Sequence, residues 1–175
     1  MNAAKLKALI VFGVILLLGS GVLVFAGLAM ESAASERLNA AAAEFSSSIG
    51  LTGSIAREPK LEGGSVGAAY SLKAQGAISG YVLYLECRGF SGKAGFLSAY
   101  AASGAFRAAR PVAVTDASLV SGGWPREEVL RAAIAPKDGA TPSQGGAEYE
   151  IVLRNLGIAI YEGQTAIERR QGGRK

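Results

Sequence analysis

The chain has 175 residues, of which 50% are hydrophobic and 18% charged, and its formal net charge is +4. That length allows one compact domain rather than two. The sequence has no histidine and a single cysteine. This composition excludes histidine-activated nucleophiles, imidazole metal sites, an internal disulfide and cysteine-based metal or redox centres. We therefore expect neither a catalytic residue nor a metal site, and any redox chemistry would need a bound group.

An uninterrupted apolar run occupies residues 8–30. At about 1.5 Å per residue it is long enough for the ~30 Å hydrocarbon core of a bilayer. It also exceeds the ~7–15 apolar residues of a cleaved signal peptide, which is the competing interpretation. Lys5 and Lys7 precede the run, and Glu31 and Glu36 follow it. The positive-inside rule then predicts a single-pass protein of the cell (inner) membrane, with its N-terminus cytoplasmic and its domain extracytoplasmic.

The first part of the predicted domain organisation is residues 1–30, a cytoplasmic tail and transmembrane anchor. Glycines inside the anchor either favour close packing against partner membrane helices or reflect the higher frequency of glycine in membrane helices. Residues 31–67 are expected to form a helical stalk, rich in alanine up to residue 49, and then a loop rich in glycine and proline.

Beyond this stalk the apolar period changes to two, which is typical of strands. We expect one hairpin from 68–75 and 80–88, and a second from 94–101 and 105–115 with a Ser103-Gly104 turn. Tyr81, Leu83, Leu85 and Cys87 alternate onto one face. Cys87 is therefore interpreted as a small core residue and not as a reactive thiol.

Two helical patterns complete the domain, which we place at residues 68–168. A short helix is expected at 125–134, opened by Pro125, and a long one at about 146–168. The long helix has an inward stripe of Tyr149, Val152, Leu156, Ile160 and Gly163, which Leu153 and Tyr161 widen. The predicted fold class is α+β: an N-terminal single transmembrane helix followed by one small antiparallel-sheet domain packed by helices.

The charge distribution argues against a nucleic-acid partner. Residues 31–168 contain twelve Lys/Arg and fourteen Asp/Glu, so the domain lacks the basic stripe that binds nucleic acid. Residues 169–175 are expected to form a solvated basic tail.

The loop before the last helix allows two interpretations. Thr141 has the position of an N-cap, with Pro142 as the first helical residue and Gln144 completing a capping box. Alternatively, Gly139 and Ala140 leave the threonine hydroxyl open beside a helix N-terminus, which attracts phosphate.

The order of these elements resembles a known family. The residues that carry the resemblance are the strand opening at Gly80-Tyr81, Gly89-Phe90-Ser91-Gly92, Asp138-Gly139-Ala140-Thr141-Pro142-Ser143, and a closing helix through Tyr161-Glu162. They resemble the FMN-binding domain of the G subunit of the Rnf electron-transport complex. They are also similar to the C subunit of sodium-translocating NADH:quinone reductase. The resemblance covers roughly residues 5 to 165.

The resemblance implies a cofactor and partners. FMN would be joined through its phosphate to the Thr141 hydroxyl as a phosphodiester by a separate flavin transferase, with Asp138, Gly139, Ala140 and Ser143 around it. The protein would be an electron-transfer subunit working with other membrane subunits of an ion-translocating oxidoreductase complex. Trp124 either stacks on the flavin ring or belongs to the core.

The alternative is a membrane-anchored, non-redox assembly subunit that keeps the fold and has lost the flavin. Two departures from the family pattern favour it. Asp138 stands where the family has serine or threonine, and residues 115–120 barely match the family's Glu-Thr-Pro-Gly-Leu-Gly loop.

Overall fold

The computed structural model describes residues 3–135 and 146–172. The chain divides into two compact units, Met1–Ala41 and Ala42–Lys175. Helix α1 (Ala3–Ser48) is one uninterrupted helix whose last turns belong to the second unit. The helix predicted from residue 31 to 49 is therefore confirmed, and it continues the preceding segment without a break.

The membrane anchor at 8–30 stays a prediction. Judged on the residues that the structure describes, none of the helices combines the length and the apolar character needed to cross a membrane. Several side chains of residues 8–30 lie outside the described set.

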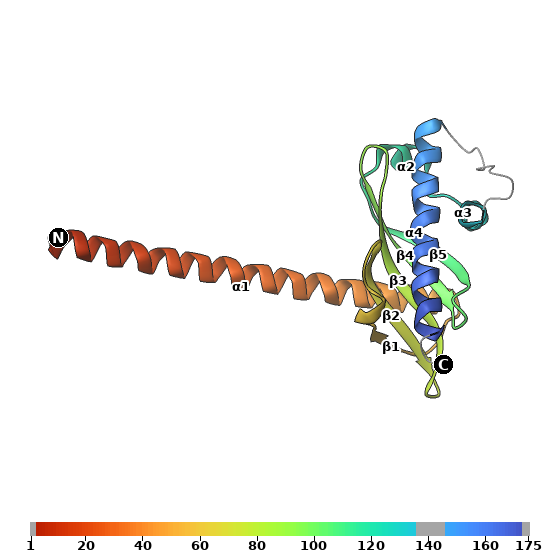
Figure 1. The fold of residues 1–175 in the computed structure, drawn as a ribbon, viewed down its shortest axis with the longest axis horizontal. Helices are drawn as coiled ribbons and strands as arrows, with labels where there is room; N and C mark the ends of the chain where they lie inside the picture. Colours follow the sequence, from red (N-terminus) through yellow and green to blue (C-terminus); the bar gives the residue numbers. More distant parts are fainter. Residues whose placement is uncertain (1–2, 136–145, 173–175) are drawn as a thin grey trace. The chain divides into compact units, whose positions relative to one another are not determined.

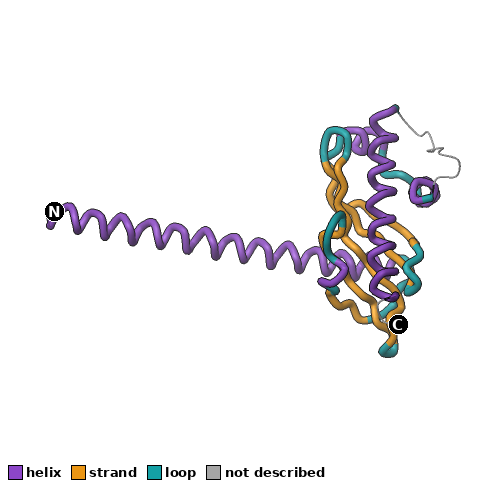
Figure 2. The backbone as a smooth tube through the Cα atoms, viewed as in Figure 1, coloured by secondary structure: helices purple, strands orange, loops and turns teal. Residues whose placement is uncertain are grey.

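The second unit is built on a five-stranded antiparallel sheet in the order β1-β2-β3-β4-β5 (Figures 1 and 2). Each strand pairs with the next one along the chain. Its strands are β1 (Ser54–Arg57), β2 (Val66–Ala74), β3 (Ala77–Arg88), β4 (Lys93–Ala101) and β5 (Phe106–Val114). The antiparallel α+β class and both predicted hairpins are confirmed.

The connections differ from the prediction in two places. The loop expected up to residue 67 contains the edge strand β1 and a short 3₁₀ helix, η1 (Pro59–Leu61). The first hairpin turns at Gln75-Gly76, where both residues have positive φ (51° and 80°), as a tight two-residue turn requires. Gly80 lies inside β3 instead, where a Cβ atom would come within 2.8 Å of the Tyr100 carbonyl oxygen.

Three helices follow the sheet: α2 (Ala117–Gly122), α3 (Glu127–Ile134) and α4 (Ala147–Gly172). α4 packs against β3 and α3, and its predicted inward stripe is buried, including Leu153 and Gly163. The expectation for Tyr161 was wrong, because its side chain is 56% exposed. Gly157 and Gly163 lie at close approaches, where a Cβ would contact Ala133 and Tyr100.

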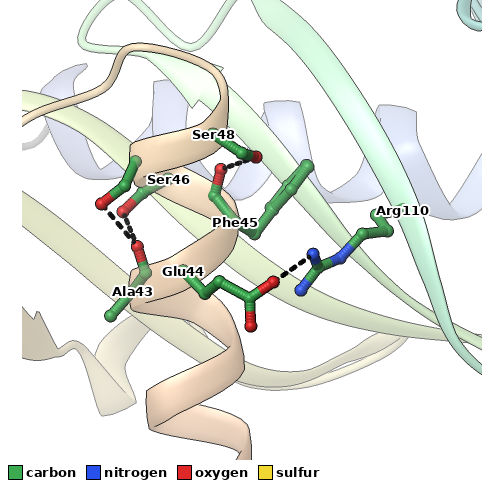
Figure 3. Close-up of polar contacts among 7 residues, drawn as sticks. Ala43, Glu44, Phe45, Ser46, Ser48 and Arg110 are labelled. Carbon is green, nitrogen blue, oxygen red and sulfur yellow. Dashed lines mark hydrogen bonds and ion pairs between the residues drawn. The ribbon is translucent and has the colours of Figure 1, made fainter.

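The opposite face of the sheet is covered by the end of α1. Ala42 and Phe45 are buried there, as is Val82 on the outer side of β3. Arg110 of β5 lies over the Phe45 ring, with its guanidinium carbon 5.5 Å from the ring centroid, and its Nη1 is 2.9 Å from Glu44 Oε1 (Figure 3). Figure 3 shows this end of α1 on one side of the strands and α4 on the other.

Candidate functional site

The most highly organised polar group in the domain is Asp116, which has no exposed surface. Its Oδ2 accepts hydrogen bonds from the backbone N–H groups of Ser91 (2.7 Å) and Gly92 (3.0 Å). Its Oδ1 accepts from the N–H groups of Ser118 (3.0 Å) and Leu119 (3.4 Å). One carboxylate therefore joins the turn between β3 and β4 to the start of α2.

These donors determine the ionisation of Asp116. Burial acts to raise the pKa of the Asp116 carboxyl, but the N–H groups of Ser91, Ser118, Gly92 and Leu119 together outweigh it and hold the pKa below its usual value. The carboxylate is thus ionised and fully engaged as a cap. Among the described residues, no cluster of His, Cys, Asp or Glu side chains is arranged to hold a metal ion.

The turn that Asp116 holds is the Gly89-Phe90-Ser91-Gly92 segment. A Cβ at Gly89 would lie 2.2 Å from Asp116 Oδ2, and one at Gly92 would lie 2.5 Å from the Thr115 carbonyl oxygen. Ser91 Oγ also accepts from the N–H of Ala117 at 3.0 Å. Both glycines are therefore required by close packing. Sequence reasoning singled out this turn but missed its partner, because Asp116 lies 25 residues away from Ser91.

Trp124 follows α2 and packs at the edge of the core, with its ring centroid 5.5 Å from that of Phe96. Its Nε1 is buried and has no hydrogen-bond partner among the described residues, and the same is true of Ser118 Oγ. The core interpretation of Trp124 is therefore supported. Buried donors are usually paired, and this one has no acceptor among the described residues.

Helix α4 begins at Ala147. The Gly146 carbonyl oxygen accepts from the N–H groups of Tyr149 (2.9 Å) and Glu150 (3.2 Å). The predicted cap, Thr141, lies outside the described residues. The first turn also carries Glu148 and Glu150, whose carboxylates complement the positive end of the helix dipole.

The predicted cofactor residues themselves fall on the segment between α3 and α4. Asp138, Gly139, Ala140, Thr141 and Ser143 all lie outside the described residues.

The structure also bears on two further predictions, those for Cys87 and for the basic tail. Cys87 is partly buried and packs against the core, and burial raises its thiol pKa to about 11, which is consistent with an inert core residue. The tail expectation was wrong for Arg169 and Arg170, because α4 continues to Gly172 and Arg170 forms an ion pair with Glu58.

Neither a known family model nor a curated protein matches this sequence. The resemblance to FMN-binding subunits therefore depends on the residues quoted above and on the order of the elements.

Proposed function

We propose that the protein is a membrane-anchored electron-transfer subunit that carries FMN on Thr141 within an ion-translocating oxidoreductase complex. One observation in the structure carries the proposal. At the edge of the core, beside Phe96, the domain keeps a buried indole N–H, that of Trp124, without an acceptor among the described residues. Buried donors are almost always paired, so this one calls for a group that the described residues do not provide.

The described residues offer a flavin two hydrogen-bonding groups, Trp124 Nε1 and Ser118 Oγ, and a flavin has acceptors on both its phosphate and its ring. When bound, FMN supplies the redox chemistry, and the protein supplies position and electrostatics.

The role assigned to Thr141 is attachment. The chain has no histidine to activate a hydroxyl, so joining the phosphate would require a separate flavin transferase. Gly139 and Ala140 would leave the hydroxyl accessible to that enzyme. Other membrane subunits of the complex would donate and accept the electrons.

A second candidate is the non-redox assembly subunit with the same fold. Glu148 and Glu150 in the first turn of α4 favour it, because their charge opposes a phosphate at that helix end. If the protein carries FMN, the phosphate has to bind despite the negative charges of Glu148 and Glu150. Whether the flavin is attached therefore decides between the two candidates.

The test is co-expression with a flavin transferase, followed by intact mass spectrometry. Wild type should gain the mass of one FMN joined with loss of water, and Thr141→Ala should gain none. Thr52→Ala, at another threonine, is the matched control and should load like wild type. An unmodified wild type, under conditions in which a known acceptor protein is modified, would favour the assembly subunit. Flavin on the Thr141→Ala protein would assign attachment to another residue.

The membrane part of the proposal has its own test. A reporter that is active only in the cytoplasm, fused after Lys175, should be silent. The intact mass of the membrane fraction should include the residues before Glu31. An active reporter would reverse the topology, and a mature chain beginning near Glu31 would make the run a cleaved signal.

A further inference from the structure

A cleft of about 690 Å³ lies at the C-terminal half of α4. Its walls are the segment around η1 with the following Gly63-Gly64 turn, and α4 from Tyr161 to Arg170. Glu162 is fifteen residues into α4 from Ala147, which is about 22 Å along the helix axis. The volume is in the range of about 300–1,000 Å³ that small-molecule sites occupy.

Three polar contacts fix the two walls relative to each other and to the sheet. Glu162 Oε2 accepts from the N–H of Ser65 at 3.2 Å, and Arg170 pairs with Glu58 across the cleft. On the sheet side, Arg57 Nε lies 2.9 Å from Glu62 Oε1. The cleft is therefore preformed, which lowers the entropy cost of binding.

The charge in this cleft is unbalanced. Its two carboxylates are engaged, Glu62 by Arg57 and Glu162 by the Ser65 N–H. Lys60 and Arg169 also line it, and neither has an ion pair or a side-chain hydrogen bond among the described residues. The Ser65 N–H carries no charge and leaves that of Glu162 in place, so Lys60 and Arg169 exceed the one carboxylate without an ion pair by a single positive charge.

The interior of the cleft is apolar. Leu61 and Val66 line it, but with only 4% and 3% of their surface exposed they give an occupant a small apolar area to cover, to which the partly buried Ala166 adds. Tyr161 adds an exposed aromatic ring at the edge. Gly64 has φ of 59° and no side chain to fill the opening. An occupant of this site needs an apolar body as well as a negative charge.

We infer that this cleft binds a small organic anion, in which a phosphate or carboxylate is held by Lys60 and Arg169 and a flat apolar body covers Leu61, Val66 and Ala166. Charge-assisted hydrogen bonds to the two cations give the orientation, and burial of the apolar body gives discrimination against inorganic anions. The site is independent of Thr141, so it is expected whether or not the protein carries flavin.

The experiment is calorimetric titration of the full chain, purified in a zwitterionic detergent. Phenyl phosphate and benzoate are the probes, and inorganic phosphate is the comparison. Phenyl phosphate or benzoate should bind at least about tenfold more tightly than inorganic phosphate, because only they cover the apolar interior. Binding should weaken as NaCl is raised.

Two variants test the assignment. Lys60→Ala with Arg169→Ala should weaken aryl anion binding by about tenfold or more. The matched control, Lys73→Ala with Arg107→Ala, removes the same charges at exposed positions elsewhere and should leave it unchanged. Thr165→Phe, which narrows the cleft and keeps every charge, should weaken phenyl phosphate binding and spare inorganic phosphate.

The inference is overturned by any of three results. These are no heat of binding with either aryl probe at millimolar concentration, aryl anions that bind no better than inorganic phosphate, or equal losses in the Lys60/Arg169 and Lys73/Arg107 variants.

Discussion

The two faces of the sheet are covered in different ways. On one face α4 contributes a continuous buried stripe from Tyr149 to Ile167. On the other, the end of α1 contributes Ala42 and Phe45, supported by the polar contacts of Arg110. The α4 face is the larger hydrophobic core, and the other face is a smaller one that buries Leu72, Val82 and Leu97 and has an exposed polar edge at Arg110. We therefore expect the stability of the domain to depend on the α4 face far more than on the α1 face.

The largest loss of stability should come from truncating a buried side chain on the α4 face. Leu156→Ala removes a fully buried side chain and should lower the free energy of unfolding by about 2–5 kcal/mol. Ile158→Ala, on the same helix but 49% exposed, is the control and should cost under about 0.5 kcal/mol. Chemical denaturation measures both. Equal losses would contradict the assignment of the core to the inner stripe.

The next largest effect on stability should come from Asp116, whose hydrogen bonds join the turn between β3 and β4 to the start of α2. Asp116→Asn keeps the shape but removes the charge and places an amide against N–H donors. It should cost about 1.5–3 kcal/mol, the range for hydrogen bonds to charged groups. Glu128→Gln, an exposed acid on α3, is the control and should be nearly neutral.

The same variant predicts a pH dependence. The folded pKa of Asp116 lies below its unfolded value, so its contribution to stability is complete above about pH 4, the unfolded pKa. It is lost as the pH falls below that value. The difference in stability between wild type and Asp116→Asn should therefore shrink on acidification from pH 6 to pH 3. A difference that stays constant over this range would mean that the charge of Asp116 contributes nothing.

A smaller effect should come from adding a methyl group to the α4 face. A Cβ at Gly163 would lie 2.6 Å from Tyr100 Oη, which donates to the Ile160 carbonyl oxygen at 2.9 Å. Gly163→Ala should cost about 1–3 kcal/mol by overpacking. Gly172→Ala, where nothing lies within 4 Å, is the matched control and should be neutral or slightly stabilising. A neutral Gly163→Ala would show that α4 can shift away from β4.

The smallest effect belongs to the α1 face. Arg110→Ala removes the ion pair with Glu44 and the contact over the Phe45 ring, and should cost about 0.5–1.5 kcal/mol. Glu44→Gln removes the ion pair alone and should lower the free energy of unfolding by less. In 0.5 M NaCl, wild type and Glu44→Gln should be equally stable, because salt screens the ion pair. A loss from Arg110→Ala as large as that from Leu156→Ala would contradict the ranking of the two faces.

The parts of the fold that were predicted are those with a strong local period. The alternation through Tyr81, Leu83 and Leu85 located β3, and the stripe from Tyr149 to Ile160 located α4, because each pattern repeats over several turns or strand positions. The strand β1 was missed for the opposite reason. It has four residues, and its extended backbone is stabilised by pairing with β2.

The candidate site was predicted less well because its contacts are distant in sequence. No local pattern links Asp116 to Ser91, and only the fold brings the two together. The cleft at α4 joins Glu58 to Arg170, which are 112 positions apart. The predicted cap and cofactor residues between α3 and α4 lie outside the described residues and stay predictions.

The sequential order of the strands has a consequence for synthesis on the ribosome. Because every strand pairs with its neighbour in the chain, the sheet can close by short-range hairpins as it emerges. The cover of one face comes last, since α4 follows every strand. Until α4 leaves the ribosome, the apolar row of Tyr81, Leu83 and Leu85 lacks the α4 part of its cover and can pack only against earlier residues of the core, such as Leu119 and Leu130. The nascent chain therefore passes through a stage in which the sheet is formed but one face is still partly exposed. At that stage, aggregation is avoided by chaperone binding or by rapid docking of α4.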